Sequence, residues 1–240
     1  MHLLTVRQIP IRLHSSFLLL GAALVGWKVL SAGPAAAMAA AGLWSLVFAS
    51  VLLHELGHAL AGRLFGVRTR DITLYPFGGV ARMELAQLRP MPEVVISIAG
   101  PMVNLGLAAL GLLLLAFNLP LGQDLLVINL GLGLFNLLPA FPMDGGRVLR
   151  ALLSLRADPL RATSQALRVS RWFAWAFVVA APLLQAWSLL LVGGFLLFAI
   201  RGEQARLAML GATGPAPRLR RPRWEEPGPG ARLAFPHPVR

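Results

Sequence analysis

Two histidines and a glutamate lie inside an apolar stretch of the chain, where ionisable groups are costly. The stretch ASVLLHELGHALAGRLFG covers residues 49–66 and contains His54, Glu55 and His58. An ionisable side chain at bilayer depth costs about 2.5–3.5 kcal/mol on insertion scales, so such residues are usually functional. Residues four apart on a helix share one face, so His54 and His58 can bind the same metal ion. Glu55 projects beside them and is suited to activate a metal-bound water. The spacing therefore predicts a catalytic metal site.

A catalytic zinc site has three protein ligands and a water, so a third ligand must come from elsewhere. The chain has no cysteine, which leaves histidine and carboxylate ligands. Among its ten acidic residues, Asp144 alone follows a proline-broken segment at the end of an apolar run that reaches the level of His54 and His58. The other acids outside the motif lie in polar loops, in basic segments or at the opposite end of a run. We therefore predict Asp144 as the third ligand, with Glu84 and Glu93 as the next candidates.

The elements that must position these residues are membrane-spanning helices. Hydrophobic residues make up 57% of the 240 residues and charged residues only 13%, with a mean hydropathy of +0.69. Soluble domains are about 45–50% apolar and about 25% charged. Apolar runs of the roughly 20 residues that cross a bilayer recur along the chain. We expect an integral membrane protein of the all-α polytopic class.

Six transmembrane helices are expected within a membrane domain of residues 1–210. The apolar runs cover residues 16–30, 36–65, 94–119, 121–138 and 172–200. The last run is too long for one span and is expected to form a hairpin of two short helices, with one kinked helix as the alternative. A signal peptide is the alternative interpretation of the first run. Residues 211–240 are basic and rich in Pro and Gly, which predicts a disordered cytoplasmic tail.

The arginines predict the orientation of the chain in the membrane. The net charge is +12, and 21 of the 22 basic residues are arginines. In the six-span arrangement all 21 lie on one side, and only Lys28 lies on the other. Cytoplasmic segments carry such an excess of basic residues, so both termini are expected in the cytoplasm. This bias accounts for the net charge without nucleic acid as a partner. The preference for Arg over Lys and the many alanines suggest a GC-rich bacterial genome, hence a bacterial cell membrane.

Three ordered motifs connect the chain to a known family. HELGH lies in one span, AGPMVN (residues 99–104) in the next, and NLLPAFPMDGGR (residues 136–147) follows. Together with IRLHSSFLLL near the N-terminus, they resemble the site-two protease family of intramembrane zinc metalloproteases. The resemblance implies that His54, His58 and Asp144 bind one zinc ion and that Glu55 is the catalytic base. We expect no PDZ-like insertion and no C-terminal regulatory domain, and in this the chain resembles the compact six-span branch related to the sporulation protease.

Further residues are candidates for contact with a substrate. Asn136, with Pro139 and Pro142 nearby, resembles a segment associated with substrate binding in the family. A small β-like loop is expected between spans two and three, in residues 71–83, and its strand at 72–76 could pair with an unwound peptide by β-augmentation. Gly78 and Gly79 lie in the same loop. Asn104 has two interpretations, either contact with the substrate or an ordinary helix–helix hydrogen bond.

The expected function is that of an intramembrane zinc metalloprotease. It would cleave a peptide bond within or near the transmembrane segment of a membrane-protein substrate, as in regulated intramembrane proteolysis, with the lipid bilayer as its surroundings. A metal transporter is one alternative, but it would need acidic residues or histidines across several spans. The half of the expected helix bundle away from the motif has no histidine and only one acidic residue, Asp124. A catalytically inactive membrane adaptor is the other alternative, although such a protein usually loses a ligand or the glutamate.

Overall fold

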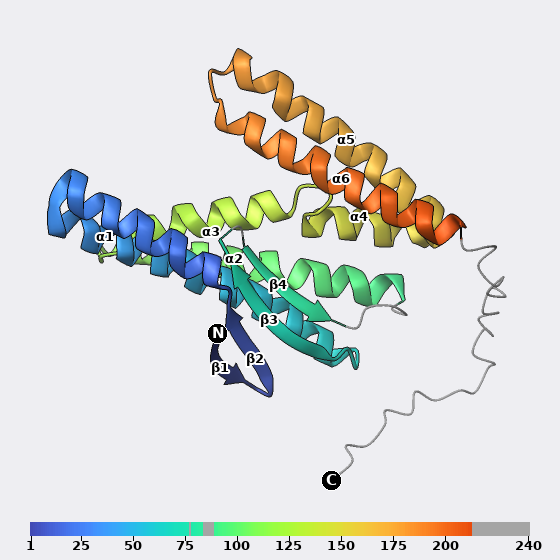
Figure 1. The fold of residues 1–240 in the computed structure, drawn as a ribbon. Helices are drawn as coiled ribbons and strands as arrows, with labels where there is room; N and C mark the ends of the chain where they lie inside the picture. The colour runs from blue at the N-terminus through green and yellow to red at the C-terminus, as the bar shows by residue number, and fades with distance from the viewer. Residues whose placement is uncertain (77, 84–88, 213–240) are drawn as a thin grey trace, which may run out of the picture. The chain divides into compact units, whose positions relative to one another are not determined.

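The computed structural model describes residues 1–76, 78–83 and 89–212 of the chain. It is mostly helical with a small sheet, as Figure 1 shows. The helices are α1 (Ser15–Leu64), α2 (Pro90–Ala116), α3 (Gly122–Asn136), α4 (Asp144–Ser154), α5 (Pro159–Leu183) and α6 (Ser188–Ala212). The strands are β1 (His2–Val6), β2 (Ile9–Leu13), β3 (Thr69–Tyr75) and β4 (Gly78–Met83). Residues Met1–Gln204 form one compact unit, to which the packing below belongs. The expected tail of residues 211–240 lies, from residue 213 onward, outside the described residues.

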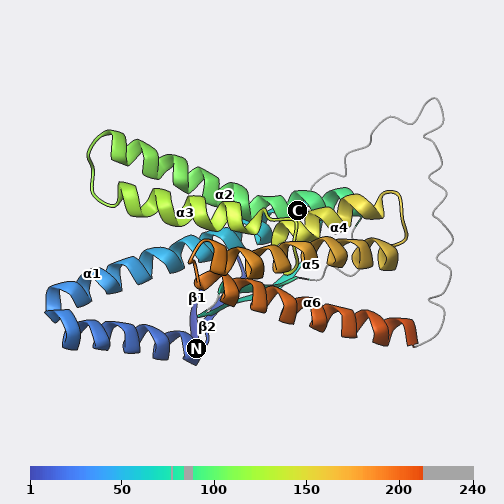
Figure 2. The same ribbon diagram turned by 90° about the horizontal axis from the view of Figure 1, so that it is seen from above.

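Helix α1 is folded back on itself near its middle. Gly33 has φ 85° and ψ 176°, a backbone conformation that only glycine adopts readily, and Pro34 follows it. Figure 2 shows the two arms that result, lying side by side. They are held by aromatic packing, since the ring of Phe17 on the first arm lies 3.8 Å from that of Phe48 on the second, centroid to centroid. The first expected run is therefore packed into the fold, and the second arm carries the HELGH motif.

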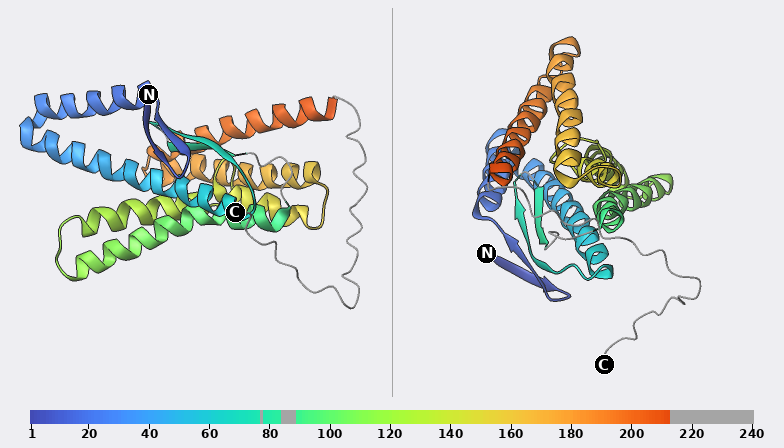
Figure 3. Two further views of the ribbon diagram at one scale, coloured as in Figure 1. Left: turned by 90° about the horizontal axis from the view of Figure 1, so that it is seen from below. Right: turned by 90° about the vertical axis from the view of Figure 1, so that its right-hand side faces the viewer.

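Four helices of the described chain are long and apolar enough to cross a membrane, namely α1, α2, α5 and α6. Helix α3 has 15 residues, fewer than the roughly 20 that span a hydrocarbon core. Helices α5 and α6 are separate and joined by residues 184–187, so two helices in residues 172–200 are confirmed and one kinked helix is wrong. Each helix has 25 residues and extends beyond that range, so the two helices are longer than predicted. Figure 3 shows these two helices from two further sides. The chain is an integral membrane protein, while the count of six spans stays a prediction.

The small sheet is larger than the sequence predicted. Its strand order is β1-β2-β3-β4, and β2 and β3 are parallel while the other pairs are antiparallel. The N-terminal residues, for which no strand was predicted, thus supply two strands. Ile72 and Leu74 of β3 pack against Val51 and Ala59 of α1, so the sheet rests on the second arm of α1, beside the HELGH motif.

The position of β3 changes the expected site of peptide pairing. β3 contains the predicted strand of residues 72–76, but it is paired with β2 on one side and with β4 on the other. A strand with two partners has no free backbone groups for an added peptide. Within the described residues, β4 is paired with β3 alone and β1 with β2 alone, so the two edges of the sheet are residues 78–83 and residues 2–6. The prediction that residues 72–76 could themselves pair with a substrate is wrong.

Candidate metal centre

The second arm of α1 presents two imidazoles to the same point. His54 and His58 are one helical turn apart and both are buried. Their Nε2 atoms lie 3.0 Å from each other. A pair of neutral imidazole nitrogens at this distance has no attraction of its own unless a proton or a cation lies between them. The arrangement is therefore that of two ligands converging on a shared ion.

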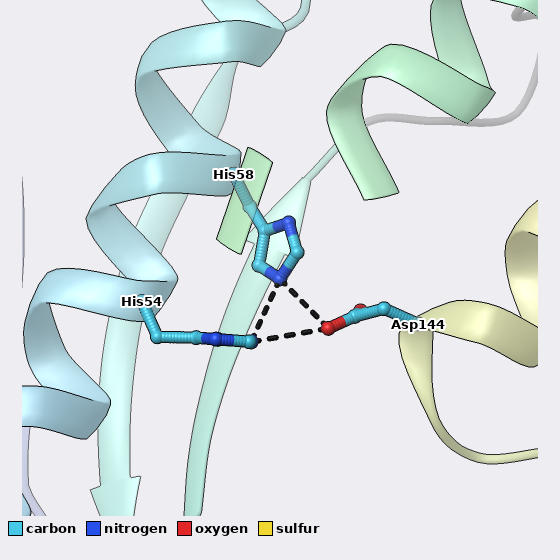
Figure 4. A group of neighbouring side chains, drawn as sticks. All are labelled: His54, His58 and Asp144. Atoms are coloured by element: carbon cyan, nitrogen blue, oxygen red, sulfur yellow. Dashed lines mark hydrogen bonds and ion pairs between the residues drawn. The ribbon is translucent and has the colours of Figure 1, made fainter. Parts of the chain in front are cut away.

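Asp144 completes a triangle with these two nitrogens. It is the first residue of α4, and Oδ2 of its buried carboxylate lies 3.1 Å from His54 Nε2 and 3.2 Å from His58 Nε2. Figure 4 shows the three side chains pointing toward one another from α1 and α4. They are the group of His, Asp and Glu side chains in the described chain whose geometry could hold a metal ion.

The triangle has the size and chemistry that zinc requires. Ligand atoms at about 2.0–2.1 Å from a tetrahedral zinc ion lie about 3.3 Å from one another. The three distances of 3.0, 3.1 and 3.2 Å are close to this spacing. Two imidazoles and one carboxylate are a donor set of catalytic zinc sites, in which water takes the fourth position. The residues present therefore fit zinc.

Helix α2 orients both imidazoles through their other nitrogens. Nδ1 of His58 donates to the main-chain oxygen of Ile96 at 2.7 Å, and Nδ1 of His54 lies 2.5 Å from Oδ1 of Asn104. Such outer hydrogen bonds fix which nitrogen faces a metal. Gly100 lies between these two contacts, and a Cβ there would collide with His58 and reach within 2.8 Å of His54 Nε2. The motif AGPMVN thus lets α2 lie directly against both rings.

A cavity of about 650 Å³ opens onto the three ligands. Its wall includes Glu55 and five of the six residues predicted to contact a substrate, namely Gly78, Gly79, Asn104, Asn136 and Pro142. Pro139, the sixth, is not among the described residues that line it. Apolar side chains from α1, α3 and α6 complete the wall, including Val47, Leu132 and Phe195. The cavity is thus apolar with a few polar groups gathered at one place, which is typical of a substrate site.

The polar residues on the wall differ in how they are held. Glu55 is half-buried, and no hydrogen bond or ion pair joins its carboxylate to another described residue. Gly79 of β4 approaches it so closely that a Cβ would collide with the Glu55 side chain. Asn136 donates to the Leu132 oxygen of its own helix at 2.9 Å. Asn104 is fully buried and bonded to protein groups through both ends of its amide.

The alternative third ligands do not join the cluster. Buried Glu93 forms an ion pair with Arg150 of α4 instead. Glu84 lies outside the described residues. Asp124 is exposed in the first turn of α3.

Two residues at or behind the cavity wall were not predicted from the sequence. Arg147 lines the cavity one turn after Asp144, and its position in the motif NLLPAFPMDGGR could have revealed it. Asn129 lies behind Asn104, and an amide inside the apolar run 121–138 was its only signal.

The comparisons with known proteins agree with this geometry. A model of peptidase family M50 matches residues 42–126 and 119–179, which together are more than half of the chain. The chain belongs to peptidase family M50. This is the site-2 protease family, so the resemblance carried by the three sequence motifs is confirmed. A solved site-2 protease from Methanocaldococcus jannaschii matches with a TM-score of 0.64 and 37% identity, covering 85% of this chain and 94% of that one.

Curated relatives match over part of their length. A zinc metalloprotease of Methanocaldococcus jannaschii is 36% identical over 207 residues, which are 84% of this chain and 59% of the relative. Stage IV sporulation protein FB of Bacillus subtilis is 32% identical over 149 residues, 58% of this chain and 51% of that protein. A putative zinc metalloprotease of Synechocystis is 35% identical, and 47% of it is covered. The chain thus spans about half the length of these relatives.

Proposed function

We propose that the chain is an intramembrane zinc metalloendopeptidase that cleaves a membrane-protein substrate within or near its transmembrane segment. The observation that carries the proposal is the buried triangle of His54, His58 and Asp144, which opens onto a cavity whose wall includes Glu55. Membership of peptidase family M50 supports the same reaction. One zinc ion per chain would be held by the three ligands.

The residues of the chain divide the chemistry between them. Zinc, when bound, would act as a Lewis acid that lowers the pKa of a water and polarises the scissile carbonyl. Glu55 is the general base, whose carboxylate takes a proton from the attacking water and delivers it to the leaving amine. Its carboxylate has no described partner to compete for that proton. Arg147, on the same wall, can donate to a substrate carbonyl.

The open edge of β4 is the proposed docking site for the unwound substrate. An extended peptide that adds to this edge gains main-chain hydrogen bonds without regard to its sequence. Gly78 and Gly79 begin β4 and line the cavity beside Glu55. The main chain of a peptide paired there would pass close to Glu55 and to the metal ligands. Asn136 and Pro142 form another part of the wall and would contact the same peptide.

The proposed orientation places the site near the cytoplasmic face of a bacterial cell membrane. The two arms of α1, then α2, α3, α5 and α6, would make six crossings with both termini cytoplasmic. The Arg-rich segments 63–89 and 147–171 then share the cytoplasmic side. Reporter fusions after residue 70 and at residue 240 should read cytoplasmic, while fusions at residues 35, 121 and 185 should read external. An external C-terminus would contradict the six crossings.

Membrane proteomics tests the proposed protease function. Cells carrying the wild-type chain, Glu55→Gln or Asp124→Asn are compared, the last being a control because Asp124 is exposed and remote from the cluster. A single-span protein should accumulate uncut in the Glu55→Gln cells alone. Identical membrane proteomes in all three strains, under conditions in which the chain is made, would contradict the proposal.

A further inference from the structure

A continuous line of hydrogen bonds leads from His54 away from the metal centre. Oδ1 of Asn104 lies 2.5 Å from His54 Nδ1, and Nδ2 of Asn104 donates to Oδ1 of Asn129 at 2.8 Å. Nδ2 of Asn129 donates to Oγ of Ser50 at 3.0 Å, and that hydroxyl donates to the Leu46 oxygen at 2.9 Å. Asn104 and Asn129 are 0% exposed and Ser50 is 1% exposed. The line runs from α1 through α2 and α3 and back to α1, and the three side chains that carry it are buried.

The far end of the line determines the direction of every bond in it. The main-chain oxygen of Leu46 can only accept, so Ser50 must donate to it and can accept from Asn129. Nδ2 of Asn129 also donates to the Leu125 oxygen at 3.0 Å, a second acceptor that holds its NH₂ group in place. Asn129 therefore turns its oxygen to Asn104, which must turn its own oxygen to His54. Nδ1 of His54 is then obliged to carry its proton, and the Nε2 lone pair is left for a metal.

We propose that Asn104, Asn129 and Ser50 are positioning residues that set the tautomer and ring orientation of His54 for metal binding. This inference rests on the proposed zinc-dependent function. His58 needs no such line, because its Nδ1 donates directly to the main-chain oxygen of Ile96. His54 has a side-chain amide as its partner, and an amide can turn by half a rotation and offer a donor instead. The residues behind Asn104 remove that freedom.

Ordinary helix–helix adhesion is the competing role, since Asn and Ser often join helices in membranes. The two roles predict different effects on zinc affinity. Adhesion stabilises the packing of α1, α2 and α3 and leaves the zinc affinity of the folded chain unchanged. Positioning changes the zinc affinity, because loss of a group that orients a metal-bound histidine typically weakens the metal site about 10- to 100-fold.

The test measures zinc affinity by chelator competition, together with thermal unfolding of the zinc-free protein. Asn104→Leu should bind zinc about 10- to 100-fold more weakly. Asn129→Leu and Ser50→Ala should weaken it progressively less, since they free Asn104 only indirectly. Asn104→Asp should keep the affinity within a few-fold of wild type, because one carboxyl oxygen can accept from His54 while the other, carrying a proton, donates to Oδ1 of Asn129. Thr163→Val is the matched control, since this buried hydroxyl of α5 bonds only its own helix, at the Pro159 oxygen.

A second measurement, of the tautomer of His54 by NMR, keeps the test decisive if the leucine variants fold poorly. In zinc-free protein with ¹⁵N-labelled histidine, His54 should carry its proton on Nδ1, and Ser50→Ala should shift part of the population to Nε2. Wild-type zinc affinity in Asn104→Leu and Asn129→Leu, with only their thermal stability reduced, would overturn the positioning role and leave adhesion. Failure of the wild-type chain itself to bind zinc would instead overturn the proposed function.

Discussion

The ligand cluster of His54, His58 and Asp144 and the open edge of β4 face the same cavity but are built on opposite principles. In the cluster, the reacting groups are buried side-chain atoms on helices, and hydrogen bonds to α2 hold the two imidazoles. At the β4 edge, the groups on offer belong to the main chain, and Gly78 and Gly79 contribute no side chain at all. Cleavage of a peptide bond needs rigidly held side-chain groups such as those of the cluster. Recognition of varied unwound peptides needs main-chain groups such as those of the β4 edge, because every peptide has the same backbone.

This difference predicts how each region responds to substitution. Changing one atom of the cluster removes a ligand or a proton acceptor, so the effect on turnover should be large and should not depend on the substrate. Changing a side chain of β4 leaves its main-chain groups in place unless the strand itself is moved, so the effect should be smaller. It should also appear in KM as well as in kcat.

The largest effect is expected from removing the carboxylate ligand. Asp144→Ala leaves two imidazoles without the negative charge that offsets the charge of Zn²⁺, so zinc occupancy should fall and cleavage should drop to background. Metal analysis of the purified variant and a cleavage assay with a single-span test protein measure the two losses. Asp124→Ala is the control and should keep both. Full zinc occupancy and activity in Asp144→Ala would show that the third ligand is misassigned.

The next effect separates metal binding from proton transfer. Glu55→Gln keeps the size of the side chain and leaves all three ligands in place, so zinc content should stay near one ion per chain. Cleavage should fall by about 100-fold or more, the lower range for losing general-base catalysis. A loss of zinc in parallel with activity would mean that Glu55 acts as a ligand and that the base lies elsewhere.

The cluster could be predicted from the sequence because its signals are local or leave few alternatives. The four-residue spacing of His54 and His58 places them on one helix face whatever the tertiary structure. Asp144 could be selected because few acids lie near the end of an apolar run. Elements that no local sequence pattern determines were missed. β2 pairs with β3 across about 60 residues of sequence, with Ile11 opposite Ile72, and no periodicity encodes such a partner.

The same reasoning explains why the peptide-binding strand was misassigned and why Asn129, behind the ligand cluster, was missed. Residues 72–76 have strand character, but strand character does not say whether a strand is internal or at an edge, and that decides which one can bind a peptide. Asn129 is an amide in an apolar run, a pattern that more often means contact between helices. Its role depends on facing both Asn104 and Ser50, which only the packing of α1, α2 and α3 brings about.

The smallest of these effects is expected where the two regions touch. A Cβ at Gly79 would collide with the side chain of Glu55, so Gly79→Val must displace either the start of β4 or the base. The three atoms nearest to that Cβ all belong to Glu55 rather than to a metal ligand, so zinc content should stay at the wild-type level. We expect kcat/KM to fall by about 10-fold, the loss of one hydrogen-bond-sized interaction of about 1–1.5 kcal/mol.

The division of that loss between kcat and KM shows whether β4 or Glu55 is displaced. A rise in KM with kcat nearly unchanged would indicate a displaced docking edge, while a fall in kcat alone would indicate a displaced base. Gly42→Val is the matched control, because a Cβ at Gly42 meets no atom within 4 Å. Activity equal to wild type in Gly79→Val would mean that the close approach of β4 to Glu55 has no part in cleavage. The edge and the cluster would then act independently, and a substrate would have to reach Glu55 by some other wall of the cavity.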